Sequence, residues 1–218
     1  MKIFAVGMNY AAHSKELHGT LLDAGGTCSD ALPRREPVIF LKADSALLKP
    51  GRPFFVPDHL GRIDYEAEVV VRICRLGKNI AKRFAHRYYD AVTVGIDFTA
   101  RDLQRQASLT GMPWTISKGF DGAAVIGEWL SVDSGRWNVD GGGLHFRLDV
   151  NGQTVQQGCT SDMLHSVDEL IAYISQFFTL KTGDLLYTGT PAGVGPVNIG
   201  DRLEGWLEDQ KVLDLNCR

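Results

Sequence analysis

The apolar residues of this chain occur mainly in short runs that are separated by glycine, proline, asparagine or aspartate. Runs at residues 3–7, 38–42, 65–73 and 92–97 are rich in β-branched side chains, which is typical of strands. The pair Asn151-Gly152 lies between two further runs and favours the tight turn of a β-hairpin. The pattern therefore predicts a protein built mainly of strands.

Helical spacing of apolar residues is confined to a few segments. Ser166 and Glu169 form a capping box, and the run that follows places its apolar residues on one helix face as far as Phe178. Weaker patterns predict helices over 81–91 and 99–107. Together these elements predict a single α+β domain over residues 1–218, strand-rich and mixed, with the helices at its periphery.

Composition narrows the class of protein. The chain has 218 residues, of which 44% are hydrophobic and 22% charged, as in a globular domain with its own core. Its net charge is -3 and no run of lysine or arginine exceeds two residues, so neither nucleic acid nor a membrane is an expected partner. The four cysteines form no Cys-x-x-Cys pair, which excludes common zinc and thioredoxin motifs and indicates a reducing, cytoplasmic location.

Two carboxylates stand out within the longest predicted strand. Because side chains two residues apart on a strand point to the same face, Glu66 and Glu68 are expected to lie side by side. Like charges so close need a positive partner, and oxygen ligands favour Mg²⁺, with Mn²⁺ or Ca²⁺ as alternatives. The spacing alone leaves open that the pair belongs to a solvated strand face.

A third carboxylate ends the buried strand at 92–97. Asp97 lies where this strand gives way to a helix, a position that faces a cleft in many folds. On that helix Arg101 and Gln104 share a face, where Arg101 could bind a carboxylate and Gln104 could donate to a carbonyl or enolate oxygen. The alternative is that Asp97 caps the helix and Arg101 is solvated.

Other candidate groups are spread along the chain. His13 and Glu16 lie three residues apart on a short predicted helix, where the carboxylate would raise the basicity of the imidazole and let it activate water. Lys118 offers a fixed positive charge to a substrate carbonyl, and the glycine- and threonine-rich residues 188–195 offer backbone N–H groups to an anion. Each also has an ordinary interpretation, as a surface hydrogen bond, a surface lysine and a turn.

Residues 18–36 contain three glycines and no hydrophobic period. A segment of this length without regular structure is usually either functional or disordered. We interpret it as a lid that closes over the substrate; the alternative is a surface loop with no part in turnover.

The motifs and their order resemble those of the fumarylacetoacetate hydrolase family in its short single-domain form, close to the acylpyruvases and the oxaloacetate-processing members. The resemblance extends from about residue 3 to residue 208 and covers nearly the whole chain. It rests on Asn9-Tyr10-x-x-His13-x-x-Glu16, Tyr65-Glu66-x-Glu68, Gly95-Ile96-Asp97-Phe98-Thr99-x-Arg101-Asp102-x-Gln104, Ser117-Lys118-Gly119-Phe120-Asp121 and Thr188-Gly189-Thr190-Pro191-x-Gly193-Val194-Gly195.

This resemblance implies a mixed β-roll with peripheral helices that forms a homodimer. It implies Mg²⁺, or alternatively Mn²⁺, as the cofactor and a small 2-oxo carboxylate as the substrate. It assigns the metal ligands Glu66, Glu68 and Asp97, the catalytic residues His13, Glu16 and Lys118, and the substrate-binding residues Arg101, Gln104, Gly189 and Thr190.

The activity expected from the resemblance is a Mg²⁺-dependent hydrolase that cleaves a C–C bond in acylpyruvate-type 2,4-dioxo acids, with pyruvate leaving as an enolate held by the metal. The alternatives are an oxaloacetate tautomerase, an oxaloacetate decarboxylase, an isomerase of the 2-hydroxyhepta-2,4-diene-1,7-dioate type, and a non-catalytic metal-stabilised scaffold. Relatives often have proline after the lysine of strand 38–42, whereas here Ala43 follows Lys42, where substrate selectivity is expected to be decided.

Overall fold

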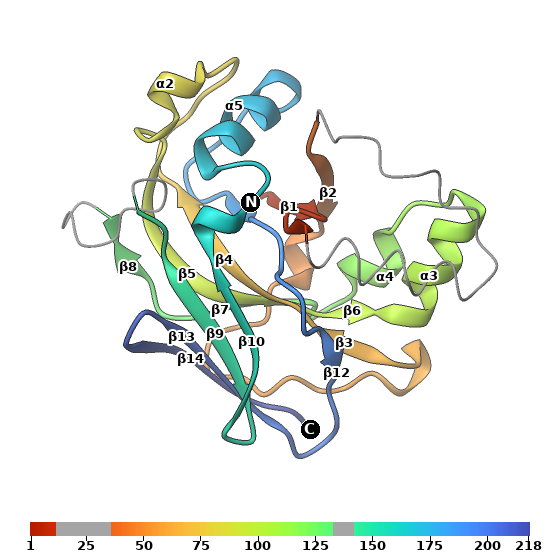
Figure 1. Cartoon of the computed structure of the whole chain (residues 1–218). Helices are drawn as coiled ribbons and strands as arrows, with labels where there is room; N and C mark the ends of the chain where they lie inside the picture. Colours follow the sequence, from red (N-terminus) through yellow and green to blue (C-terminus); the bar gives the residue numbers. More distant parts are fainter. Residues whose placement is uncertain (12–35, 133–141) are drawn as a thin grey trace.

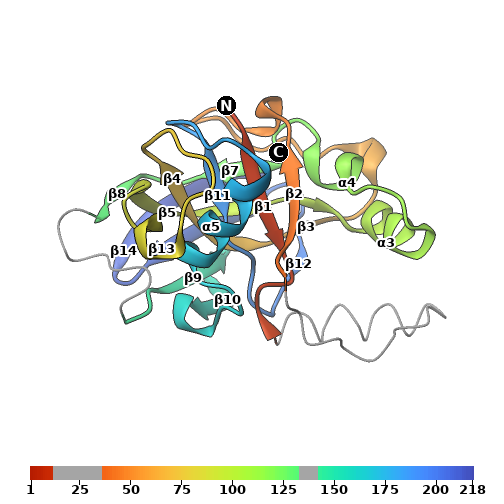
Figure 2. The same cartoon turned by 90° about the horizontal axis from the view of Figure 1, so that it is seen from above.

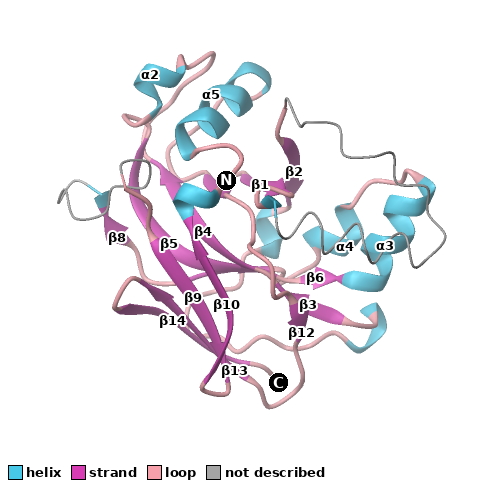
Figure 3. Cartoon of the chain, viewed as in Figure 1, coloured by secondary structure: helices cyan, strands magenta, loops and turns pink. Residues whose placement is uncertain are grey.

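The computed structural model describes residues 1–11, 36–132 and 142–218 (Figure 1). His13, Glu16 and nearly all of the predicted lid at 18–36 lie outside the described residues, so their predictions are not tested here. The described strands form three sheets, and the helices lie around them (Figure 3). The predicted α+β class, with a mixed sheet and peripheral helices, agrees with this arrangement.

The central sheet has seven strands, in the order β2-β1-β11-β4-β5-β7 with β8 paired to β5. It is mixed, because β1 and β11 run parallel while the other pairs are antiparallel. Its two longest strands are buried over nearly all of their length, which explains their almost continuous apolar sequences. The strands are β1 Ile3–Gly7, β2 Val38–Lys42, β4 Ala67–Ile73, β5 Tyr89–Asp97, β7 Ala124–Ile126, β8 Leu130–Ser131 and β11 Leu185–Tyr187.

A four-stranded antiparallel sheet, in the order β10-β9-β13-β14, packs against the central sheet through contacts with β4 and β5. One hydrophobic core cluster includes buried residues of both sheets. Asn151 and Gly152 form the turn between β9 and β10 with positive φ angles of 52° and 79°, which confirms the predicted hairpin. The strands are β9 His145–Val150, β10 Gln153–Cys159, β13 Arg202–Leu207 and β14 Gln210–Asn216.

A small sheet of three short strands, β12-β3-β6, continues from the central sheet. Its strands are β3 Ile63–Tyr65, β6 Thr99–Ala100 and β12 Gly195–Pro196. The chain passes directly between the central and the small sheet through a single residue at two points, at Glu66 between β3 and β4 and at Phe98 between β5 and β6. The single strand predicted over 65–73 is therefore interrupted at Glu66. The predicted helix at 99 begins only at Arg101, because Thr99 and Ala100 pair with β3.

The α-helices within the described residues are α2 Lys82–Ala85, α3 Arg101–Thr110, α4 Thr115–Gly119 and α5 Val167–Phe177. The capping box of α5 is confirmed, since the Glu169 N–H donates to Ser166 Oγ and the Ser166 N–H donates to Glu169. α5 contributes its buried face to the core, and α2, which is labelled in Figure 1, lies beside it (Figures 1 and 2). The helix predicted over 81–91 is shorter because Tyr89 already belongs to β5. In the described part of the chain no helix is long and apolar enough to span a membrane.

The tight packing at Gly95 gives a test of this fold. A β-carbon there would lie 2.5 Å from the Val125 carbonyl oxygen and 2.7 Å from Val70 Cγ2. We expect Gly95→Ala to lower the free energy of unfolding by about 1–3 kcal/mol in urea titrations of the metal-free protein. Gly142→Ala, with nothing within 4 Å of the added β-carbon, should change it by less than about 0.5 kcal/mol. Equal unfolding midpoints for the two variants would contradict the packing described.

Candidate metal centre

Three carboxylates meet where the chain leaves the central sheet. One oxygen from each of Glu66, Glu68 and Asp97 lies within 4.8 Å of the other two, and all three side chains are buried. The Asp97 N–H donates to the Glu66 carbonyl oxygen at 2.8 Å, which fixes the end of β5 beside the break between β3 and β4. The structure thus brings together the three residues that the sequence predicted as metal ligands. A donor set of oxygens alone suits a hard divalent cation.

The electrostatics of Glu68 support this interpretation. Burial raises the pKa of Glu68 well above its usual range, and the nearby charges of Asp97 and Glu66 raise it further. Lys118 and the Gly189 N–H, which donates to Glu68 Oε2 at 2.6 Å, lower it only in part. A divalent cation bound here would therefore stabilise the ionised form of this buried carboxylate. The residues present fit such an ion.

Lys118 reaches this cluster from α4, a helix that the sequence did not predict. Its Nζ lies 2.7 Å from Glu66 Oε2 and 2.9 Å from Asp97 Oδ2, and the residue is 2% exposed. Burial lowers the pKa of Lys118, but Asp97 and Glu66 raise it by more, so the group stays an ammonium ion. The structure therefore places Lys118 against two of the three carboxylates, while its expected contact with a substrate carbonyl stays a prediction.

Lys42 is a second buried cation, and sequence reasoning gave it no role in the site. Its Nζ lies 2.5 Å from Asp97 Oδ1 and donates hydrogen bonds to the carbonyl oxygens of Lys118 and Ala123. Burial lowers the pKa of Lys42, while Asp97 acts in the opposite direction. Its position at the end of β2 was visible in the sequence, but that position alone does not indicate a partner on β5.

Arg101 and Gln104 also lie at the cluster, on the first turn of α3. Arg101 donates from Nη2 to Glu66 Oε1 at 2.6 Å and from Nη1 to Gln104 Oε1 at 2.6 Å. Its Nε donates to Asp64 Oδ2 at 2.8 Å. Asp64 was missed, although it lies two residues before Glu66 and continues the same-face series of carboxylates that Glu66 and Glu68 define.

The residues that follow β11 contact β4, the strand that carries Glu68. Gly189 has a φ of +101°, and a β-carbon there would lie 2.7 Å from the β-carbon of Asn9, so this position requires glycine. Thr190 Oγ1 donates to the Ala67 carbonyl oxygen at 2.8 Å and accepts from Gln156 Nε2 at 2.9 Å. The predicted substrate-binding pair Gly189 and Thr190 therefore lies against β4, with the Thr190 hydroxyl hydrogen directed to β4.

Asn9 connects this segment to the chain that leads to His13. Its Nδ2 donates to the carbonyl oxygens of Thr188 at 2.8 Å and His165 at 3.0 Å, and its Oδ1 accepts from the His165 N–H at 2.9 Å. Asn9 is 1% exposed, so these bonds satisfy an otherwise buried carboxamide. The motif that contains His13 and Glu16 thus begins at a residue fixed next to Gly189.

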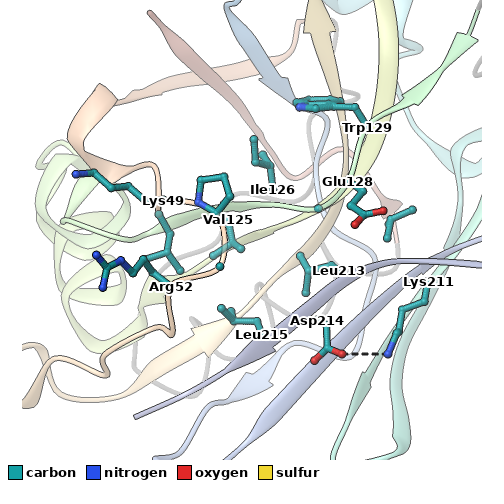
Figure 4. Close-up of a pocket in the computed structure, with 15 residues that line it drawn as sticks. Lys49, Arg52, Val125, Ile126, Glu128, Trp129, Lys211, Leu213, Asp214 and Leu215 are labelled. Atoms are coloured by element: carbon teal, nitrogen blue, oxygen red, sulfur yellow. Dashed lines mark hydrogen bonds and ion pairs between the residues drawn. The ribbon is translucent and has the colours of Figure 1, made fainter.

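A separate cavity of about 490 Å³ lies between β7, β14 and residues 48–52 (Figure 4). Lys49 and Arg52 lie on one side of it, and the ion pair of Lys211 and Asp214, at 3.0 Å, lies on the other. Its floor is apolar, and none of the three clustered carboxylates lines it. This cavity is therefore not part of the candidate metal centre.

Comparisons with known proteins agree with the geometry. The family described as "Fumarylacetoacetate (FAA) hydrolase C-terminal" matches residues 2–217. The mitochondrial oxaloacetate tautomerase FAHD1 of Arabidopsis thaliana is 40% identical over 93% of this chain and 84% of its own length. The oxaloacetate tautomerase YcgM of Escherichia coli is 36% identical over 93% of this chain and 86% of its own length.

A solved structure extends the comparison to the fold. The crystal structure of fumarylpyruvate hydrolase from Pseudomonas aeruginosa, in complex with Mn²⁺ and pyruvate, superposes with a TM-score of 0.86 at 32% identity. The match covers 100% of this chain and 89% of that one, which confirms the expected mixed β-roll architecture. Because the family match spans nearly the whole sequence and relatives above 30% identity share its length, this chain is a member of the fumarylacetoacetate hydrolase family.

Proposed function

We propose that this chain is a divalent-metal-dependent oxaloacetate tautomerase, which interconverts the keto and enol forms of this small 2-oxo dicarboxylate. The observation that carries the proposal is the meeting of Glu66, Glu68 and Asp97 with Lys118 and Arg101 at one buried centre. The names of the curated relatives support it, since those at 36–40% identity reported above are oxaloacetate tautomerases. They favour the tautomerase over the C–C hydrolase that the sequence analysis put first.

The metal would be held by the three clustered carboxylates. A bound Mg²⁺ or Mn²⁺ ion supplies Lewis-acid chemistry, polarising the 2-oxo group and binding the adjacent carboxylate. The Mn²⁺ and pyruvate in the structure of the fumarylpyruvate hydrolase support this choice of cation and ligand class.

The charge balance of the site favours an anionic substrate. Four buried carboxylates, Asp64, Glu66, Glu68 and Asp97, lie among three largely buried cations, Lys42, Arg101 and Lys118. Asp64 also pairs with the half-exposed Arg62, so these groups balance in charge, and a divalent cation would leave the centre with two excess positive charges. A dicarboxylate is attracted to such a centre.

The chemistry of tautomerisation requires a proton to move between C3 and the oxygen on C2. Lys118 and Gln104 would stabilise charge that develops on this oxygen, because both can donate a hydrogen bond there. His13, supported by Glu16, would take the proton from C3 as the general base, and the enolate oxygen would gain a proton from solvent water to complete the enol; the reverse steps give the keto form. No water attack is involved, so the same residues can serve tautomerisation without the additional step that hydrolysis needs.

A C–C hydrolase is the second candidate. The superposition with the fumarylpyruvate hydrolase favours it, because that enzyme shares the fold over the whole chain. In this case His13 and Glu16 would activate water for attack on the distal carbonyl of an acylpyruvate. Decarboxylation of oxaloacetate is a third outcome of the same centre and would release CO₂.

The proposal is tested by a substrate panel with Mg²⁺. We expect the protein to accelerate the keto–enol interconversion of oxaloacetate, followed by ultraviolet absorbance, and EDTA to remove the acceleration. Acetylpyruvate and fumarylpyruvate, monitored for cleavage products, should react far more slowly. Cleavage of either compound at a rate above that of tautomerisation would instead support the hydrolase, and CO₂ release at such a rate would support the decarboxylase.

Substitution of Glu68 separates metal binding from stability. Because folding buries this carboxylate beside two others, Glu68→Gln should make the metal-free protein more stable, with its melting temperature rising by about 2–4 °C for each kcal/mol gained. Calorimetric titration should find no Mg²⁺ binding to the variant. Asp184→Asn, which removes the charge that pairs with Lys2 at 2.6 Å, should lower stability and keep Mg²⁺ binding. A destabilised Glu68→Gln protein that still binds Mg²⁺ would refute the assignment.

His13 tests the proposed proton transfer. If its imidazole is the base, His13→Ala should lower kcat for oxaloacetate by roughly 10²–10⁴-fold, since a positioned general base contributes about that much. Mg²⁺ affinity, measured by calorimetry, should stay at the wild-type value. His59→Ala, at an exposed histidine, serves as the control. An unchanged kcat in His13→Ala would assign the proton transfer to another group.

A further inference from the structure

Next to the metal ligands, a chain of hydrogen bonds runs from Asp64 to Gln104. Asp64 lies at the centre of the small sheet, opposite Pro196 of β12 and Thr99 of β6, and is 1% exposed. Its Oδ1 accepts from Arg62 Nε at 2.6 Å, and its Oδ2 accepts from Arg101 Nε at 2.8 Å. Two charged donors therefore hold this buried carboxylate in one orientation.

Arg101 transmits that orientation in two directions. Its guanidinium is planar, so a bond at Nε fixes where Nη1 and Nη2 point. Nη2 donates to the metal ligand Glu66, and Nη1 donates to Gln104 Oε1, each at 2.6 Å. The charges of Glu66 and Asp64 more than offset the effect of burial and raise the pKa of Arg101, so it remains a cation.

The consequence for Gln104 is a fixed amide orientation. Its oxygen must face Arg101, because the NH₂ group in that place would oppose a donor with a donor. The NH₂ end then faces away from Arg101, and Gln104 is 7% exposed, so little solvent competes for it. With its oxygen bound to Arg101, Gln104 can offer a ligand its N–H donors only.

We propose that Asp64 is a positioning residue for the reaction: through Arg101 it aligns Glu66 and directs the amide N–H of Gln104 toward the carbonyl or enolate oxygen of the substrate. This inference rests on the proposed 2-oxo acid chemistry. Donors that are fixed before reaction stabilise developing negative charge without reorganisation. If the Arg101 guanidinium could rotate freely, the Gln104 amide would have no fixed orientation.

A purely structural role for Asp64 makes a different prediction. The backbone pairing of β3 with β6, together with the bond from the Arg101 N–H to the Arg62 carbonyl oxygen at 2.9 Å, does not use the Asp64 side chain. If Asp64 served stability alone, its substitution would lower the melting temperature and leave the kinetics of the remaining folded protein unchanged.

The test compares Asp64→Asn with Asp149→Asn. Asp149 is also a buried carboxylate bonded to an arginine, Arg147, but it lies in the four-stranded sheet. We expect Asp64→Asn to lower kcat for oxaloacetate with Mg²⁺ by about tenfold or more, less than the roughly 10²–10³-fold loss of a donor itself. Its Mg²⁺ affinity should fall by less than about threefold, since the three ligands remain. Asp149→Asn should keep wild-type kcat.

A readout without turnover separates this inference from the proposed function. In ¹⁵N spectra of the metal-loaded wild type, the Arg101 Nε–H and the Gln104 side-chain NH₂ should give sharp, slowly exchanging signals. In Asp64→Asn both should shift and exchange at least tenfold faster, whichever 2-oxo acid the enzyme uses. Gln104→Glu, which keeps the acceptor for Arg101 and removes the donor, should lower kcat by the full loss of a donor, roughly 10²–10³-fold.

The outcomes are distinct. Unchanged Arg101 and Gln104 signals in Asp64→Asn would overturn the proposed positioning role of Asp64, whatever reaction the wild type catalyses. Wild-type kcat in Asp64→Asn, with turnover present in the parent protein, would also overturn it. If the wild type does not convert oxaloacetate but Asp64→Asn shows the predicted spectral changes, the proposed function is refuted and the positioning role of Asp64 is still supported.

Discussion

The burial of three carboxylates at one point is the constraint on which the rest of this structure depends. Glu66, Glu68 and Asp97 place oxygens within 4.8 Å of one another where almost no solvent reaches. Uncompensated, such a cluster would oppose folding strongly. Lys118 and Lys42 lie against these carboxylates, and a bound divalent cation would stabilise the cluster further.

The fold explains why the cluster forms where it does. Two neighbouring antiparallel strands leave the central sheet at the same level, one through the break at Glu66 and the other after Asp97. Both carboxylates therefore lie at a junction of two sheets, while the third, on Glu68, comes from the following residues of β4. Relatives of this chain are named as an oxaloacetate tautomerase and as a fumarylpyruvate hydrolase, so family membership alone does not decide the reaction.

Local patterns in the sequence were enough to predict the hairpin at Asn151, the capped helix at Ser166 and the same-face pair of Glu66 and Glu68. Each depends on residues close together in the chain. The family motifs added Asp97, which no local pattern connects to β4. The role of Lys42 could not be predicted, because Lys42 lies on β2 and its partner Asp97 lies on β5, a strand that does not pair with β2. The short helix that carries Lys118 was missed because five residues give no helical period.

The central claim is that the three carboxylates form one cation site in the folded protein. A crystal structure of the protein grown with Mn²⁺, with anomalous diffraction data collected at the manganese edge, tests it most directly. The account predicts one manganese peak per chain, bound by an oxygen of each of Glu66, Glu68 and Asp97. A manganese ion bound elsewhere, with the triad neutralised by Lys118 and Lys42 alone, would contradict it.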